Sequence, residues 1–157
     1  MNPIQEKLLN KEWRIKNLYK IRNKEGQLIV FKRNRTQRHF NDNLHTRNLI
    51  LKSRQLGFTT DEVIDGLDEV LFTPNRDMLL IAHNLEAGES IFSKKISFAW
   101  EKIHPQLKEL YQVDTDTSKT LKFNFGKKGF SSIAVDTSGR SGTYHRVHIT
   151  EFADLCK

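Results

Sequence analysis

A run of nine residues about one third of the way along the chain resembles a phosphate-binding loop. In the pattern G-x-x-x-x-G-K-[ST], backbone N–H groups and the N-terminus of the following helix hold phosphate oxygens. Gly57 occupies the second glycine position and Thr59 the hydroxyl position that would hold Mg²⁺, whereas Lys52 and Phe58 replace the first glycine and the lysine. The predicted nucleotide-binding residues of this loop are Lys52, Ser53, Arg54, Gln55, Leu56, Gly57, Phe58, Thr59 and Thr60.

We interpret Lys52 as a phosphate-binding lysine that has moved to the start of the loop. A loop that curls around a β-phosphate brings its two ends close together. Because lysine acts as a mobile point charge, an ammonium group at either end can reach the β and γ oxygens. The alternative is an ordinary strand–turn–helix corner that happens to contain Lys, Arg and Gly. The loop alone leaves both interpretations open.

A second candidate group ends the apolar segment at residues 146–151. ATP hydrolases with a phosphate loop need a strand whose last residues hold the magnesium shell and polarise the attacking water. Glu151 is therefore the candidate catalytic base, and Thr150 is a candidate magnesium ligand where an aspartate is usual. The alternative is a buried strand whose terminal glutamate simply faces water. The two motifs support each other because each follows a predicted strand and their order is right.

Hydrophobic periodicity predicts the elements that position these groups. Apolar residues at helical spacing over residues 61–72 favour a helix directly after the loop. Strands are predicted at residues 49–51, 78–82 and 147–149, hairpins at 19–31 and 121–135, and further helices at 3–11, 34–45 and 84–103. Strands that alternate with amphipathic helices predict an α/β fold, a P-loop NTPase with a mostly parallel sheet flanked by helices.

Length and composition favour one globular domain, with residues 1–46 as a helix, hairpin and adenine-side segment and residues 47–157 as the ATPase core. The net charge is +7. Residues 1–60 contain 14 Lys and Arg against 4 Asp and Glu, whereas residues 61–157 contain 12 against 15. A basic first third should attract a polyanion, either nucleic acid or a nucleoside triphosphate, although a solvated basic face is the alternative. The single cysteine, Cys156, and the lack of a signal or membrane-spanning pattern predict a cytosolic protein.

With these motifs the chain resembles the large terminase subunit of tailed phages and prophages, the ATP-driven motor that packages DNA into a procapsid. The resemblance covers nearly the whole chain, and its most specific part is the loop with its early lysine. The matching strings are Trp13-Arg14-Ile15, Asn17-Leu18-Tyr19, Phe31, Gln37, residues 51–60 and Ile149-Thr150-Glu151-Phe152-Ala153.

The resemblance implies a role for each matching residue. Tyr19 and Gln37 would lie near the adenine, with Gln37 reading its hydrogen-bonding edge. The loop would bind ATP and Mg²⁺, Arg54 would sense or stabilise the γ-phosphate, and Glu151 would activate water. The implied partners are double-stranded DNA, the portal and the small terminase subunit, with a homo-oligomer forming in the cytoplasm of the bacterial host and no membrane involved.

Members of the family continue beyond the strand that ends at Glu151, first into a motif that couples hydrolysis to movement and then into a nuclease domain. We therefore expect an N-terminal ATPase part, truncated after the Walker B strand, with marginal stability and weak turnover. Two other functions stay open at this point. One is a non-catalytic nucleic-acid-binding or assembly module that uses the basic first third, and the other is an inactive prophage remnant.

Overall fold

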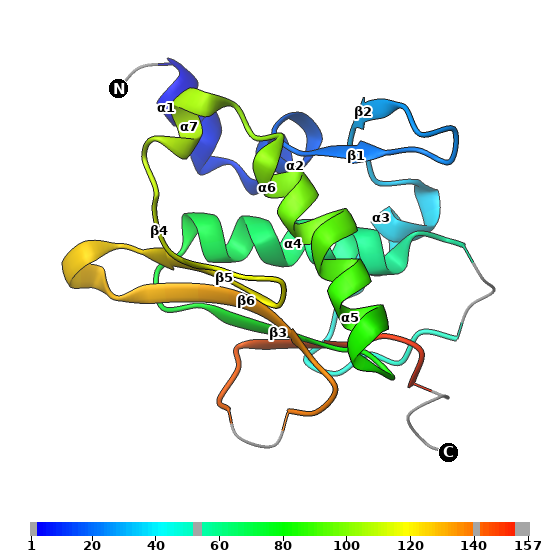
Figure 1. Ribbon diagram of the computed structural model, residues 1–157. Coiled ribbons are helices and arrows are strands. Elements are labelled where there is room, and N and C mark those ends of the chain that lie inside the picture. The colour runs from blue at the N-terminus through cyan, green and yellow to red at the C-terminus, as the bar shows by residue number, and fades with distance from the viewer. Residues whose placement is uncertain (1–2, 52–54, 140–141, 153–157) are drawn as a thin grey trace.

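The computed structural model describes residues 3–51, 55–139 and 142–152 of the chain. A five-stranded sheet with the order β4-β5-β6-β3-β7 lies below a long helix, and a separate two-stranded hairpin, β1–β2, lies above that helix (Figure 1). The strands are β1 (Lys20–Arg22), β2 (Leu28–Val30), β3 (Asp77–Ile81), β4 (Gln112–Asp116), β5 (Thr120–Asn124), β6 (Phe130–Asp136) and β7 (Arg146–Ile149). The helices are α1 (Pro3–Leu9), α2 (Lys11–Asn17), α3 (Arg35–Asp42), α4 (Phe58–Phe72), α5 (Leu85–Ile91), the π-helix η1 (Phe92–Ser97), α6 (Phe98–Glu101), α7 (Pro105–Lys108) and the 3-10 helix η2 (Gly126–Lys128).

Helix α4 is the central element of the fold. It packs on β3 and β6, and the continuous helical segment α5–η1–α6 crosses over it (Figure 1). The contact with the sheet is close at Gly66, where an added Cβ would lie 1.8 Å from the sulfur of Met78. One core unites the N-terminal segment with the rest of the chain. Its members include Ile15, Tyr19, Phe31, Ile64, Leu67, Leu71, Leu80, Phe92, Trp100, Phe123 and Ile133.

The prediction of a mostly parallel sheet was wrong. Strand β3 pairs in parallel with β6 and with β7, whereas β4–β5 and β5–β6 are antiparallel, so the sheet is mixed. The antiparallel half follows from short connections. Only a few residues join β4 to β5 and β5 to β6, and a parallel pair would need a crossover of about a dozen residues or more.

The strand predicted at residues 49–51 is also absent from the structure. Leu49 and Leu51 are exposed, with 86% and 101% of their surface accessible, and no described residue of this segment pairs with the sheet. A run of three apolar residues satisfies a strand pattern, but the pattern says nothing about whether a neighbouring strand is available. The segment expected to form a buried parallel strand before the loop thus has no regular secondary structure and is largely exposed.

Most of the locally encoded elements are confirmed. The predicted helix at residues 61–72 is α4, which begins three residues earlier, and the strand at residues 78–82 is β3. Both hairpins, the helix after Asn84 and the last strand are present. The helix predicted at residues 3–11 ends at Leu9. Asn10 then caps a second helix, since its side chain accepts a hydrogen bond from the Trp13 N–H, and no prediction was made for that helix.

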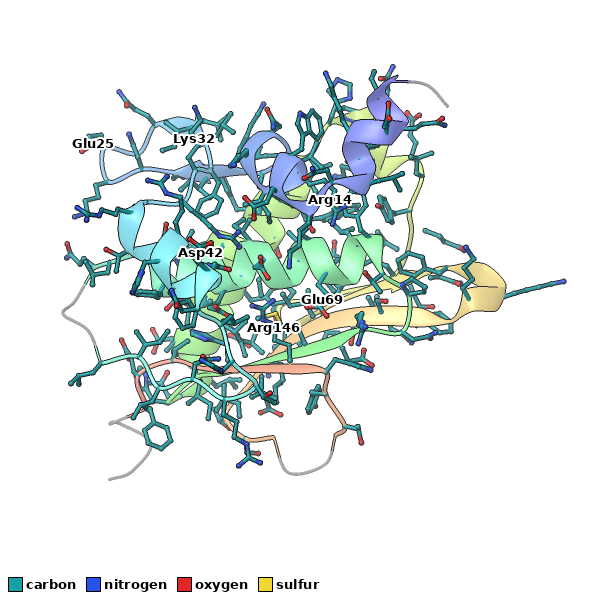
Figure 2. All side chains as sticks on the ribbon, turned by 180° about the vertical axis from the view of Figure 1, so that it is seen from behind. Arg14, Glu25, Lys32, Asp42, Glu69 and Arg146 are labelled. Carbon is teal, nitrogen blue, oxygen red and sulfur yellow. The ribbon has the colours of Figure 1, made fainter. Side chains whose placement is uncertain are left out.

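An ion-pair network surrounds α4 and connects the N-terminal segment and β7 to this helix. Arg14 comes from α2 on one side of α4, and Arg146 from β7 on the other (Figure 2). The α4 ion-pair network comprises the carboxylates Asp61, Glu62, Asp65, Asp68 and Glu69 and the cations Lys11, Arg14, Arg33, Arg76 and Arg146. Five carboxylates thus meet five cations, so buried charge on α4 is compensated locally.

Two arginines make the strongest contacts in this network. Arg14 binds Asp68 with two hydrogen bonds of 2.7 and 2.9 Å, and both side chains are buried. Arg33 donates to Asp61 at 2.7 Å and also contacts Asp65. Such forked pairs fix the direction of each helix more firmly than a single ammonium contact would.

Acid should weaken this network through Asp65. Burial favours the protonated carboxyl, but Lys11 and Arg146 overcome it and lower the pKa of Asp65 from 3.8 to about 2. Because the folded pKa lies below the unfolded value, the stabilisation is complete above pH ~4 and is lost as the pH falls toward ~2. Asp65→Asn should therefore cost about 2 kcal/mol at pH 7 and almost nothing at pH ~2, measured by denaturant unfolding. A cost that does not change with pH would contradict this assignment. Asp61 and Glu62 should show the opposite dependence on pH, because burial raises the pKa of both carboxyl groups.

Candidate functional site

The turn that leads into α4, from Gln55 to Phe58, has the backbone geometry of an anion site, and we call it the corner. Gly57 is the N-cap residue and has φ 75°, a conformation that glycine adopts without strain. An added Cβ at this position would lie 2.9 Å from the side-chain nitrogen of Gln37, so the Gln37 side chain would have to shift. Since Gly57 has no side chain, it leaves the first N–H groups of the 15-residue helix without a side-chain cap. These N–H groups and the positive end of the helix dipole favour an anion.

Side chains from the N-terminal segment hold the corner in place. Gln37 Nε2 donates to the Gly57 carbonyl at 2.9 Å, and Asn34 Nδ2 donates to the Leu56 carbonyl at 3.2 Å. From the β1–β2 hairpin, Lys24 Nζ donates to Gln55 Oε1 at 3.1 Å. The first 46 residues therefore position the loop, even though they are distant from it in sequence.

The residues of the loop itself differ in their exposure. Phe58 is buried and meets the ring of Phe40 edge-on at 5.5 Å, which anchors the start of α4. Thr59 and Thr60 are half-buried in the first turn, and Gln55 is exposed with φ 66°. The predicted phosphate-binding residues Lys52, Ser53 and Arg54 lie outside the described residues.

The two residues predicted beside the adenine already have partners within the protein. Tyr19 is fully buried, and its hydroxyl donates to Asp68 at 2.8 Å. Burial and the neighbouring carboxylate raise the pKa of Tyr19 well above its usual value. The amide of Gln37 accepts from the Asn34 N–H at 2.8 Å and donates to Gly57. In this structure Gln37 therefore supports the corner from within, whereas Tyr19 contacts α4 near its other end.

Lys95 is a residue of this corner that the sequence did not reveal. Its Nζ donates to the Thr60 hydroxyl at 2.6 Å, in the first turn of α4. Burial lowers the pKa of this amine. The surrounding sequence gave only the apolar spacing of a helix, which carries no sign that η1 crosses the start of α4.

Glu151 lies at the edge of the sheet where the parallel strands β3 and β7 end. These strands pair as far as Ile81 and Ile149, and two residues beyond each lie His83 and Glu151. His83 Nδ1 and Glu151 Oε2 are 2.9 Å apart. Glu151 has φ 53°, which is strained for a residue other than glycine and is often found at functional sites.

A carboxylate paired with an imidazole can accept a proton from water and pass it on, so this pair suits general base chemistry. Thr150 beside it is buried, and its N–H donates to the Ile81 carbonyl at 2.9 Å. The sequence predicted Glu151 but not His83. The only feature of the sequence that could have indicated His83 was its position directly after a predicted strand.

The described residues contain no group of three or more His, Cys, Asp or Glu side chains that could hold a metal ion. The predicted magnesium ligands, Thr59 and Thr150, are hydroxyls. They fit an ion that takes most of its ligands from phosphate oxygens and water, as Mg²⁺ does in nucleotide sites.

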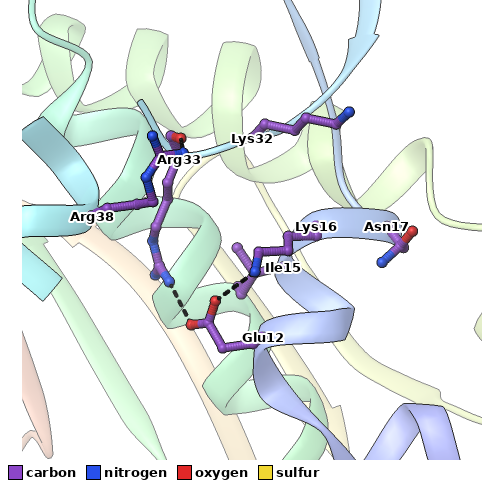
Figure 3. Close-up of a pocket in the computed structure, with 7 residues that line it drawn as sticks. All are labelled: Glu12, Ile15, Lys16, Asn17, Lys32, Arg33 and Arg38. Atoms are coloured by element: carbon purple, nitrogen blue, oxygen red, sulfur yellow. Dashed lines mark hydrogen bonds and ion pairs between the residues drawn. The ribbon is translucent and has the colours of Figure 1, made fainter. Parts of the chain in front are cut away.

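A cavity of about 380 Å³ lies between α2 and the segment that leads into α3 (Figure 3). Arg33 and Lys16 both contact Glu12 at its edge, so part of its positive charge is neutralised. Lys32 and Arg38 also line it. The cavity adds a basic surface to the N-terminal segment that supports the corner.

No helix in the described part of the chain is long and apolar enough to cross a membrane. We compared the sequence with models of known protein families and with curated protein sequences, and neither comparison gave a match.

Proposed function

We propose that this chain is the nucleotide-binding part of an ATP-driven DNA-packaging motor of the large-terminase type. The observation that carries the proposal is the corner at Gly57, where a left-handed glycine opens a long helix that has no side-chain cap. A nucleoside triphosphate matches this corner because its phosphates need several N–H donors and a positive potential. The motifs around Lys52 and Glu151 support the choice of this family.

In the proposed mechanism, the N–H groups of the first turn of α4 hold the β- and γ-phosphates, and Lys52 neutralises their charge. Magnesium, held in part by Thr59, would supply further charge neutralisation. Glu151 accepts a proton from water as the water oxygen bonds to the γ-phosphorus. The bond from the γ-phosphorus to the bridging oxygen then breaks, and ADP and phosphate form. His83 orients the Glu151 carboxylate through their 2.9 Å contact.

Binding of Mg·ATP should raise the melting temperature of the chain. Ligand at about 100 times its dissociation constant stabilises by about 2.7 kcal/mol, which corresponds to roughly 5–10 °C for a chain of this size. Lys52→Ala should abolish the shift, because the proposal assigns to Lys52 the cation that neutralises the β- and γ-phosphates. Thermal unfolding followed by circular dichroism, with and without Mg·ATP, measures both effects.

Lys127→Ala is the matched control, since Lys127 is exposed in η2 and the substitution removes the same charge. This variant should keep the full ATP shift. An equal shift in Lys52→Ala and in the unmodified chain would overturn the assignment of the lysine. Indifference of the unmodified chain to ATP would favour the nucleic-acid-binding module instead.

A further inference from the structure

A second cavity, of about 510 Å³, opens between strand β1 and the α5–η1–α6 segment. Its lining includes three cations, two hydroxyl groups and one aromatic ring, and no carboxylate. We call it the β1–η1 groove. The residues that matter for its chemistry are Arg22, Ser90, Ser93, Lys94, Lys95 and Phe98.

No carboxylate among the described residues neutralises the positive charge of the β1–η1 groove. Within residues 3–51, 55–139 and 142–152, none of Arg22, Lys94 and Lys95 lies within ion-pair distance of a carboxylate. The α4 ion-pair network shows the opposite arrangement, with a carboxylate for each buried arginine. Three adjacent cations without counter-charges create a potential that attracts a polyanion.

Two of these cations are held in position. The guanidinium of Arg22 lies over the ring of Phe98, 4.9 Å from its centre, and this contact fixes the guanidinium plane. Lys95 is half-buried and donates one hydrogen bond to Thr60, which leaves further N–H donors available. Lys94 is exposed beside it in η1, a π-helix, and such irregular turns are frequent at functional sites.

We propose that the β1–η1 groove binds the phosphate backbone of a nucleic acid. The groove is open and much larger than a single phosphate, and its cations come from two separate elements, as successive phosphates require. Its described lining has no Asn, Gln, Asp or Glu side chain, and its Arg, Lys and Ser side chains can all contact phosphate oxygens. We expect binding through the backbone, with little dependence on base sequence. The proposal rests on the function proposed above only for the choice of double-stranded DNA as the partner.

The test is binding of a fluorescent 30-base-pair duplex of arbitrary sequence, followed by anisotropy at several salt concentrations. The double variant Arg22→Gln/Lys94→Gln should bind about 10- to 60-fold more weakly at ~0.1 M salt, because each lost phosphate contact costs roughly 8-fold there. The slope of log affinity against log salt should become shallower by about 2. Lys127→Gln/Lys128→Gln, with the same loss of charge in η2, should bind almost as well as the unmodified chain.

Equal losses of duplex affinity in the two double variants would contradict the assignment of the groove and would indicate only non-specific attraction to net charge. Lys94→Gln alone is a further check, because Lys94 is exposed and its replacement should not disturb folding. It should flatten the salt slope by about 1. A single-stranded competitor that displaces the duplex at equal concentration would assign the groove to single strands instead and contradict the choice of duplex DNA.

These experiments test the groove and the nucleotide corner independently of each other. The Arg22→Gln/Lys94→Gln variant should keep its Mg·ATP melting shift, because neither side chain contacts the corner at Gly57. Absence of duplex binding together with an intact ATP shift would overturn the groove alone. Absence of an ATP shift together with duplex binding that depends on Arg22 and Lys94 would overturn the ATPase and leave the groove standing.

Discussion

Glu151→Gln should lower the rate of ATP hydrolysis by a factor of about 10²–10⁴, the usual contribution of a general base. The amide keeps the size and the hydrogen-bonding capacity of the carboxylate but takes up no proton from water. Binding of Mg·ATP should be unchanged, because the phosphate corner and Glu151 belong to different elements. Phosphate release measured at saturating ATP, together with the ATP melting shift, separates these two effects.

Glu86→Gln is the matched control for this substitution. Glu86 is an exposed glutamate in the first turn of α5, a few residues beyond His83, and its replacement should leave the rate within a factor of about 2. His83→Asn should reduce the rate by a smaller factor than Glu151→Gln, since the imidazole only positions the base. An unchanged rate in Glu151→Gln would remove this residue from the mechanism.

Arg33→Met should destabilise the fold by about 3–5 kcal/mol, because it leaves the buried carboxylate of Asp61 without its cationic partner and removes one of the cations that contact Asp65. Arg33 is 9% exposed, and it contacts both Asp61 and Asp65 of α4. Methionine fills much of the same volume, so the loss reports the missing charge rather than a cavity. Denaturant unfolding at pH 7 measures the change in the free energy of unfolding.

Lys16→Met is the control for Arg33, since Lys16 also pairs with a carboxylate but is 61% exposed at the surface. Its cost should stay below about 1 kcal/mol. The cost of Arg33→Met should also shrink toward pH 4, because burial already raises the pKa of Asp61 and protonation removes the unpaired charge. A small and pH-independent cost would contradict a supporting role for the network.

The elements set by local pattern were predictable from sequence. Helix α4 follows from a 3.6-residue apolar repeat, although it begins three residues before the predicted start, directly after Gly57. Both hairpins follow from short polar turns that contain glycine. The position of Glu151 at a strand end was predictable for the same reason.

The features that depend on distant pairing were not predictable. Residues 49–51 match a strand by composition, but a strand forms only where another strand offers a free edge in the right direction. His83 and Lys95 join the candidate site through contacts of 2.9 and 2.6 Å with Glu151 and Thr60, residues far away in sequence. The parallel and antiparallel halves of the sheet likewise follow from connection lengths, which apolar periodicity does not encode.

The most direct measurement of the central claim is the set of amide resonances at the start of α4, recorded by NMR during titration with Mg·ATP. The N–H signals of Gly57, Phe58, Thr59 and Thr60 should shift most, and inorganic triphosphate should shift the same signals. Shifts confined to other parts of the chain, with these four amides unmoved at saturating ATP, would contradict the account.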